Sequence, residues 1–172
     1  RMAERLGITV FGTSPKFVAA CEKAGLRPGE QHDLSKLRAV LSTGSPLTIE
    51  NFRWVYENVK KDLHFNSIAG GTDINGCFAI GGPTVPVYAG QTQKRGLGMK
   101  VNCYDEQGKT LYDALGELVC EAPSPSMPLY FWNDPDGKKY REAYFDVYPN
   151  VWRHGDYIVI HSDSGGATFY GR

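Results

Sequence analysis

The sequence has no excess of either charge, no long apolar run and no paired cysteines. Its 172 residues contain nineteen basic and nineteen acidic side chains, whereas proteins that bind nucleic acid or anionic membranes usually carry a basic excess. No apolar stretch approaches the roughly 20 residues that cross a bilayer, and the N-terminus has no signal-peptide pattern. We therefore expect no nucleic-acid partner, no membrane partner and a cytoplasmic location.

The cysteines are few and widely spaced. Cys21, Cys77, Cys103 and Cys120 form no C-x-x-C pair. Neither a disulfide framework nor a zinc site is expected, and a reducing cytosol is the simpler context.

The composition is that of a folded protein with many turns. Hydrophobic residues make up 41% of the chain and charged residues 22%, which suits one or two globular units with a real core. Twenty glycines and ten prolines predict a loop-rich and strand-rich region. The first residues, RMAERLGITV, are typical of the end of a helix, and the last, ATFYGR, follow a strand-like run. We expect an excised fragment of a longer protein.

Residues 1–80 alternate between strand and helix patterns. Ser14-Pro15 supplies an N-cap and a first-turn proline for one helix. From Thr48, apolar residues recur at the spacing of a second helix with one buried face. Short strand patterns lie at 8–11, 37–41 and 63–65. This alternation predicts an α/β domain with part of a parallel sheet and its crossover helices.

Residues 81–172 follow a different pattern. The short runs VPVY, GMKVNCY, GELVCE, LYFW, DYIVIH and ATFY are separated by Gly, Pro, Asn and Asp. Turn signals at 134–137 and 163–166 are expected between strands. These patterns predict a second domain, a small antiparallel β-barrel or sandwich. The aromatic stretch at 130–145 is expected to form core and barrel wall.

The stretch NSIAGGTDINGC at 66–77 is the first candidate for chemistry. Gly70 and Gly71 follow a predicted strand, where the loops of α/β sheets bind ligands, and glycine amides can point together at a phosphate. Thr72 could donate to a phosphate oxygen, and Asp73 beside it could hold a bridging magnesium ion. The alternative is a plain turn in which Thr72 or Asp73 caps the next segment.

Two further loops have the same ambiguity. The backbone of LSTGSPL at 41–47 could line a flat ring such as adenine, or could simply connect a strand to a helix. Asp156 in WRHGD could accept hydrogen bonds from both hydroxyls of a ribose, or could be a solvated turn residue. We expect His154 to be a surface or turn histidine, since no paired nucleophile is evident.

In their order, these loops resemble the motifs of the adenylate-forming superfamily, which includes acyl-CoA synthetases, luciferases and nonribosomal adenylation domains. TGSP resembles the adenine-lining loop, GGTD the G-x-T-E motif, GELVCEAP the G-E-L motif and WRHGD the R-T-G-D motif. Gly171-Arg172 resembles the start of the G-R-x-D hinge motif. Five motifs in the right order cover almost the whole chain past residue 40.

The resemblance implies a role for each matched residue. Thr72 and Asp73 would be catalytic, with Thr72 on the adenylate phosphate and Asp73 at the position of the magnesium-associated glutamate. Asp156 and Arg172 would hold the ribose hydroxyls. The other implied nucleotide contacts are Gly44, Ser45, Pro46, Ser67, Gly70 and Gly71.

The chain departs from the family pattern near the phosphate motif. Asp73 is one methylene shorter than the usual glutamate, and Ala69 replaces an aromatic residue that packs on adenine. Ser67 stands where an Asn or Asp often reads the adenine amino group. Gly70 stands where acetate-activating relatives carry tryptophan, which implies an acyl pocket enlarged for a four-carbon keto acid.

The implied activity is that of an acyl-CoA synthetase. An acid and ATP, with Mg²⁺, would form an acyl-adenylate and pyrophosphate, and a moving C-terminal domain would then permit thiolysis by coenzyme A. The family's phosphate loop would lie upstream of this fragment and its catalytic lysine downstream, so the fragment alone is expected to be inactive. The alternatives are a synthetase for acetate or propionate, a non-catalytic nucleotide-binding module, and a scaffold without a nucleotide site.

Overall fold

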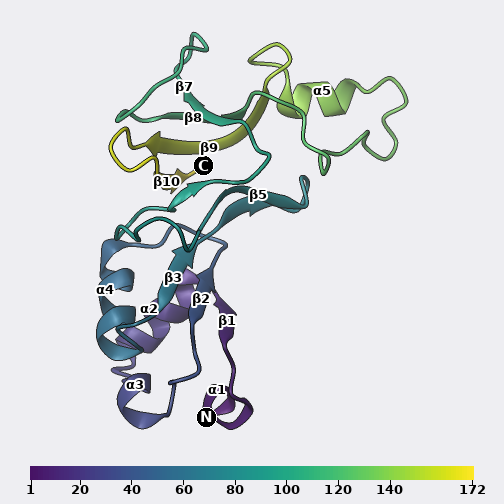
Figure 1. The fold of residues 1–172 in the computed structure, drawn as a ribbon. Coiled ribbons are helices and arrows are strands. Elements are labelled where there is room, and N and C mark those ends of the chain that lie inside the picture. Colours follow the sequence, from purple (N-terminus) through teal and green to yellow (C-terminus); the bar gives the residue numbers. More distant parts are fainter. The chain divides into compact units, whose positions relative to one another are not determined.

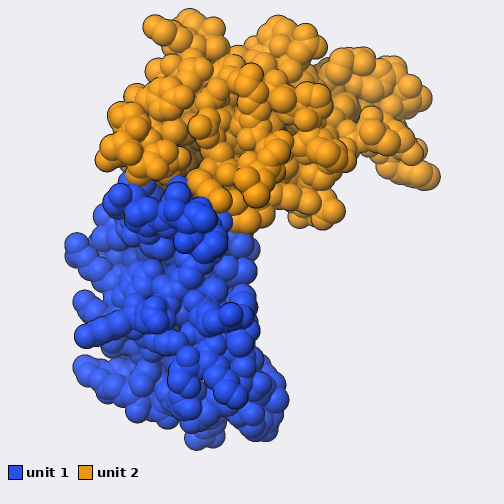
Figure 2. Space-filling model, viewed as in Figure 1, with its two compact units in different colours: residues 1–68, 81–93 blue, residues 69–80, 94–172 orange.

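The computed structural model describes residues 1–172, which form two compact units (Figures 1 and 2). The first unit comprises residues 1–68 and 81–93, and the second comprises residues 69–80 and 94–172. The predicted division at residue 80 places residues 69–80 in the first unit and residues 81–93 in the second. The structure has these two segments the other way round. Residues 69–80 join the second unit because Ile74 and Phe78 are buried in its core.

The first unit contains a three-stranded parallel sheet, which confirms the predicted α/β pattern. Strands β1 (Val10–Thr13), β2 (Ala39–Ser42) and β3 (His64–Ser67) lie in the order β1-β2-β3. Helices α2 (Pro15–Lys23) and α4 (Ile49–Asn58) form the crossovers between them (Figure 1).

The two crossover helices begin where the sequence predicts. The Ser14 hydroxyl accepts a hydrogen bond of 3.3 Å from the amide of Phe17, with Pro15 in the first turn. Thr48 and Asn51 form a reciprocal capping box. The remaining helices of this unit are α1 (Met2–Leu6) and α3 (Pro28–Gln31). The buried core consists of Val18, Leu37, Val40, Leu47, Phe52, Val55, Leu63 and Phe65.

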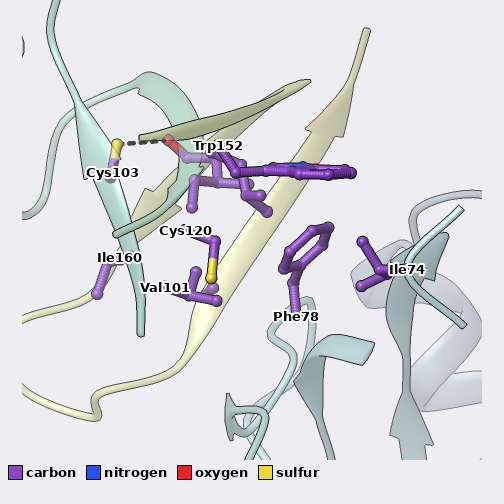
Figure 3. Packing of buried hydrophobic residues seen from close by; sticks show 10 residues of the cluster. Ile74, Phe78, Val101, Cys103, Cys120, Trp152 and Ile160 are labelled. Atoms are coloured by element: carbon purple, nitrogen blue, oxygen red, sulfur yellow. Dashed lines mark hydrogen bonds between the residues drawn. The ribbon is translucent and has the colours of Figure 1, made fainter. Parts of the chain in front are cut away.

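The second unit is built from two antiparallel sheets around one core, which confirms the predicted antiparallel subdomain. One sheet contains β4 (Ala69–Gly71), β5 (Gly76–Ile80) and β6 (Lys94–Arg95). The other has the order β10-β9-β8-β7, with β7 (Val101–Tyr104), β8 (Gly116–Cys120), β9 (Trp152–Ile160) and β10 (Ala167–Gly171). Figure 3 shows Phe78 of β5, and Ile74 of the turn between β4 and β5, pointing into the core that holds Trp152 and Cys120.

The aromatic stretch is only partly what the sequence predicts. Its first part is irregular, so the prediction of a strand is wrong there. Tyr130 and Trp132 are exposed by 68% and 87%, so they form no buried wall, whereas Phe131 contacts the rings of Tyr140 and Tyr144. Its second part is helix α5 (Lys138–Tyr144) rather than a strand. Asp134 accepts hydrogen bonds from the amides of Lys139 and Tyr140, which satisfies free donors at the helix start. A turn does form at 134–137, where the Gly137 amide donates a 3.1 Å hydrogen bond to the carbonyl of Asp134, but it leads into α5 and does not join two strands.

The other predictions for residues 81–172 are partly confirmed and partly wrong. The aromatic rings of Tyr140, Tyr144 and Phe145 pack against the core as expected. The turn at 163–166 joins the antiparallel strands β9 and β10, as predicted. The run VPVY at 85–88 forms no strand. None of the helices has the length and apolar character needed to cross a membrane.

Candidate nucleotide site

The GGTD stretch forms the tip of a β-hairpin. Gly70 and Gly71 lie in β4 and pair with Cys77 and Gly76 of β5, and residues 72–75 form the turn. A Cβ on Gly70 would overlap the carbonyl oxygen of Gly76. The close approach of two backbones therefore requires glycine at this position.

The carboxylate of Asp73 folds back over the hairpin. The hydroxyl of Tyr144 donates a hydrogen bond of 2.8 Å to its Oδ2, and a Cβ on Gly71 would overlap its Oδ1. Burial and this bond to a carboxylate raise the pKa of Tyr144 to about 12, so the phenol stays a donor at neutral pH. Thr72 is exposed in the turn.

The HGD segment is a bulge in β9. Arg153 pairs with Val119 and Tyr157 pairs with Glu117, so residues 154–156 all lie opposite Leu118. Gly155 has a left-handed φ of 86°, which favours glycine. Bulges of this kind redirect side chains and are frequent beside active sites.

The buried carboxylate of Glu117 holds this bulge in place. Its Oε1 accepts a 2.8 Å hydrogen bond from the Gly155 amide, and its Oε2 accepts a 3.1 Å bond from Nε of Arg153. The side chain thus replaces partners that the interrupted strand ladder cannot supply. Glu117 thereby holds the bulge that contains Asp156.

Asp156 lies between two basic groups. Nε of Arg172 is 3.4 Å from its Oδ1, and Nε2 of His154 is 3.6 Å from its Oδ2. The structure therefore brings together the two predicted ribose-binding residues, which come from separate motifs. The Arg172 side chain is 75% exposed, and such an exposed pair contributes little to folding stability.

His154 is buried, so the expectation of a surface or turn histidine is wrong. It is only 8% exposed and contacts the ring of Phe78 edge-on, with 4.5 Å between the ring centroids. Nε1 of Trp152 donates to its Nδ1 at 3.5 Å. Burial lowers the pKa of His154 more strongly than the neighbouring Asp156 raises it, which keeps the ring neutral at pH 7.

The predicted adenine loop lies in the first unit. Gly44, Ser45 and Pro46 follow the carboxyl end of β2, and Gly44 has a left-handed φ of 95°. Before them, the Thr43 hydroxyl donates a 3.0 Å hydrogen bond to the carbonyl of Ile68. This is the edge of a parallel sheet at which ligands usually bind.

Buried polar side chains end the neighbouring strands at the same edge. Ser67 is the last residue of β3 and pairs with Ser42 of β2. Both are buried, as is Asn66. Neither Oγ of Ser42 nor Oδ1 of Asn66 has a hydrogen-bond partner.

The predicted site residues fall in both units. Gly44, Ser45, Pro46 and Ser67 belong to the first unit, and Gly70, Gly71, Thr72, Asp73, Asp156 and Arg172 belong to the second. Within the second unit, the His154 side chain lies against both the hairpin and Asp156.

Three residues that support the site were not predicted from the sequence, namely Glu117, Tyr144 and His154. The alternation of Trp152 and His154, which places both on one strand face, is the signal that could have identified the histidine.

Comparison with known proteins identifies relatives along the whole chain. No protein-family profile matches it. Acetoacetyl-CoA synthetases from Gallus gallus and from Rhizobium meliloti (strain 1021) are 46% and 51% identical to it over 171 and 170 residues, which are 99% of this chain. The chain is a relative of the acetoacetyl-CoA synthetases. It spans only 26% of the length of each of these two relatives.

Solved structures support the same relationship. An acetoacetyl-CoA synthetase from Streptomyces lividans is 48% identical, with a TM-score of 0.90 over 99% of this chain and 27% of its own. The anthranilate CoA ligase AuaEII, solved with anthranoyl-AMP, has a TM-score of 0.78 over 99% of this chain and 30% of its own, at 23% identity, which shows a shared fold alone. The resemblance to adenylate-forming enzymes and their fold class is thus confirmed.

Proposed function

We propose that the chain is part of an ATP-dependent acid–thiol ligase that activates acetoacetate and transfers it to coenzyme A. The observation that carries the proposal is the arrangement of Asp156 between Arg172 and His154, beside the hairpin of Thr72 and Asp73. Acetoacetyl-CoA synthetases with 46% to 51% identity along the chain support this choice of acid and thiol. The first step would yield an acyl-adenylate and pyrophosphate.

Asp156 and Arg172 would bind the ribose of the nucleotide. A carboxylate only accepts hydrogen bonds, so Asp156 would accept from the two ribose hydroxyls. The exposed Arg172 guanidinium can share this acceptor without a large loss of stability. The Thr72 hydroxyl, exposed at the hairpin tip, would donate to a phosphate oxygen.

A magnesium ion would be held by Asp73. Magnesium usually takes one or two protein carboxylates and fills its remaining positions with phosphate oxygens and water. Asp73 fits this pattern, because Tyr144 donates to only one of its two oxygens. When bound, the ion would offset the negative charge of the phosphates while the acyl-adenylate forms and pyrophosphate leaves.

Two groups of residues would bind the remaining parts of the substrates. The Gly44-Ser45-Pro46 loop and Ser67 would line the adenine, since they follow the carboxyl ends of parallel strands. Gly70 would leave room for the four-carbon acyl group. We also propose a cytoplasmic location, and a phosphate loop and catalytic lysine contributed by other parts of the same protein.

The test is ATP–pyrophosphate exchange by the full-length protein with a panel of acids. Acetoacetate should support the fastest exchange, ahead of acetate and propionate, and addition of coenzyme A should yield acetoacetyl-CoA. Faster exchange with acetate would contradict the proposed specificity. Absence of exchange with every acid would contradict the proposed enzyme class and favour a non-catalytic nucleotide-binding module.

A further inference from the structure

His154 lies between two parts of the proposed nucleotide site. A Cβ on Gly71, directly before Thr72 and Asp73, would be 3.2 Å from its Cε1. On its other side, its Nε2 faces Oδ2 of Asp156 at 3.6 Å. The histidine ring therefore packs on the phosphate hairpin and also faces the ribose carboxylate.

The hydrogen bonding of the ring determines where its proton lies. The indole N–H of Trp152 can only donate, and it points at Nδ1 of His154 with a separation of 3.5 Å. Nδ1 must then be the acceptor, so the proton of the neutral ring lies on Nε2. That nitrogen is the one that faces Asp156.

Packing restricts the ring to this orientation. The Phe78 ring contacts it edge-on at 4.5 Å between centroids, and on the hairpin side the ring lies close to Gly71, where an added Cβ would be 3.2 Å from its Cε1. The Trp152 ring that orients the histidine is itself fully buried and stacks on Tyr144, with 3.6 Å between centroids. A supporting shell of this kind is what keeps a binding group in its productive geometry.

We propose that His154 is a positioning residue of the nucleotide site, whose Nε2–H orients the carboxylate of Asp156 toward the ribose hydroxyls. The inference rests on the proposed nucleotide function. A separation of 3.6 Å is longer than a direct hydrogen bond, and such contacts commonly shorten when a ligand binds. The proposed role is to orient Asp156, because the buried His154 side chain faces this carboxylate.

Calorimetric titration of the full-length protein with AMP and with 2′,3′-dideoxy-AMP tests this role. The wild type should prefer AMP by roughly tenfold or more, since the analogue leaves Asp156 without its donors. His154→Leu, which removes the donor but fills the space, should lose most of this preference. His154→Gln, which retains an N–H near Nε2, should keep most of it.

Two reference variants calibrate the result. Asp156→Ala should lose at least as much of the preference as His154→Leu. His161→Leu removes a histidine directly after β9, whose Nε2 is hydrogen-bonded to Thr168 instead, and should keep the wild-type preference. The thermal unfolding of each variant shows whether it folds like the wild type. If His154→Leu does not fold, His154→Asn replaces it, because its shorter amide cannot reach Asp156.

Three outcomes would overturn the inference. These are an unchanged preference in His154→Leu or His154→Asn, equal losses in His154→Gln and His154→Leu, and a wild type that binds both nucleotides equally. By contrast, a wild type that prefers AMP but forms no acetoacetyl-CoA contradicts the proposed reaction while the variants still test His154.

Discussion

The hydroxyl of Tyr144 donates a 2.8 Å hydrogen bond to Oδ2 of Asp73, across 71 positions of sequence. The same tyrosine ring stacks on Trp152 with 12° between the ring planes. Helix α5 is thereby attached both to the hairpin tip and to the core strand that leads into the HGD bulge. The carboxylate proposed to hold magnesium thus has one of its oxygens already fixed.

Replacing Tyr144 with phenylalanine should lower activity more than stability. The change removes the donor to Asp73 but keeps a ring for stacking on Trp152. Hydrogen bonds to charged groups contribute about 1.5–3 kcal/mol, so we expect ATP–pyrophosphate exchange by the full-length protein to fall by roughly tenfold or more. The melting temperature should change by only a few degrees.

The matched control is Tyr140→Phe, on the preceding turn of α5. Tyr140 also packs against the core, but its hydroxyl is not the donor to Asp73. This variant should retain wild-type exchange. Equal losses in both variants would show that the Tyr144 effect comes from helix packing and not from the bond to Asp73.

The phenol of Tyr144 should lose its proton only at strongly alkaline pH. Its pKa is raised from 10 to about 12, first by burial and then by the bond to Asp73. A raised pKa means that the neutral phenol stabilises the fold fully below pH 10, and that this contribution is lost as the pH rises toward 12.

The measurement is a phenolate absorbance titration of wild type and Tyr144→Phe. Their difference should contain one tyrosine that ionises near pH 12. Tyr104, whose pKa burial and Glu121 also raise to about 12, remains in both proteins and cancels. A difference curve centred at the ordinary value of 10 would contradict the buried hydrogen bond.

The parallel half of the fold could be read from sequence because its signals are local. The caps at Ser14 and Thr48 and the helical spacing after Thr48 lie within the segments that they specify. The parallel sheet then follows from the alternation of strands and helices. The adjacency of Asp156 and Arg172 was predicted only through the motif resemblance, because no local pattern links these residues.

The unpredicted features depend on contacts between distant residues. The HGD bulge that buries His154 is held by Glu117, which is 38 positions before Gly155. Without that contact, WRHGD has the composition of a surface turn. Similarly, α5 follows the turn at 134–137 where a strand was expected, and its first amides donate to Asp134, a side chain that precedes the helix.

The two hairpin glycines should respond differently to alanine. At Gly70 the added Cβ meets the backbone oxygen of Gly76, which cannot move without distorting β5. We expect a loss of stability of about 1–3 kcal/mol. At Gly71 the Cβ meets the movable carboxylate of Asp73, so we expect a smaller loss of stability and a larger loss of ATP–pyrophosphate exchange.

Denaturant unfolding and exchange assays on the full-length variants separate these effects. Gly12→Ala in β1 is the control, because its Cβ would meet nothing within 4 Å and its φ is not left-handed. It should leave both measurements unchanged. A Gly71→Ala variant with normal exchange would argue against the proposed use of Asp73.

Glu117 should be the most sensitive position for the geometry of the ribose site. Glu117→Ala leaves the Gly155 amide without its acceptor and Arg153 without its carboxylate, and an unsatisfied buried group costs about 1–3 kcal/mol. Because the bulge places Asp156, the variant should also bind AMP more weakly. Glu117→Gln retains an acceptor for the Gly155 amide and should recover part of both losses.

The control is Glu142→Gln, which breaks an exposed pair with Lys138 and should change stability by less than about 0.5 kcal/mol. Denaturant unfolding and AMP calorimetry on the three variants measure both effects, and normal AMP binding by a folded Glu117→Ala protein would show that Asp156 is placed by other contacts.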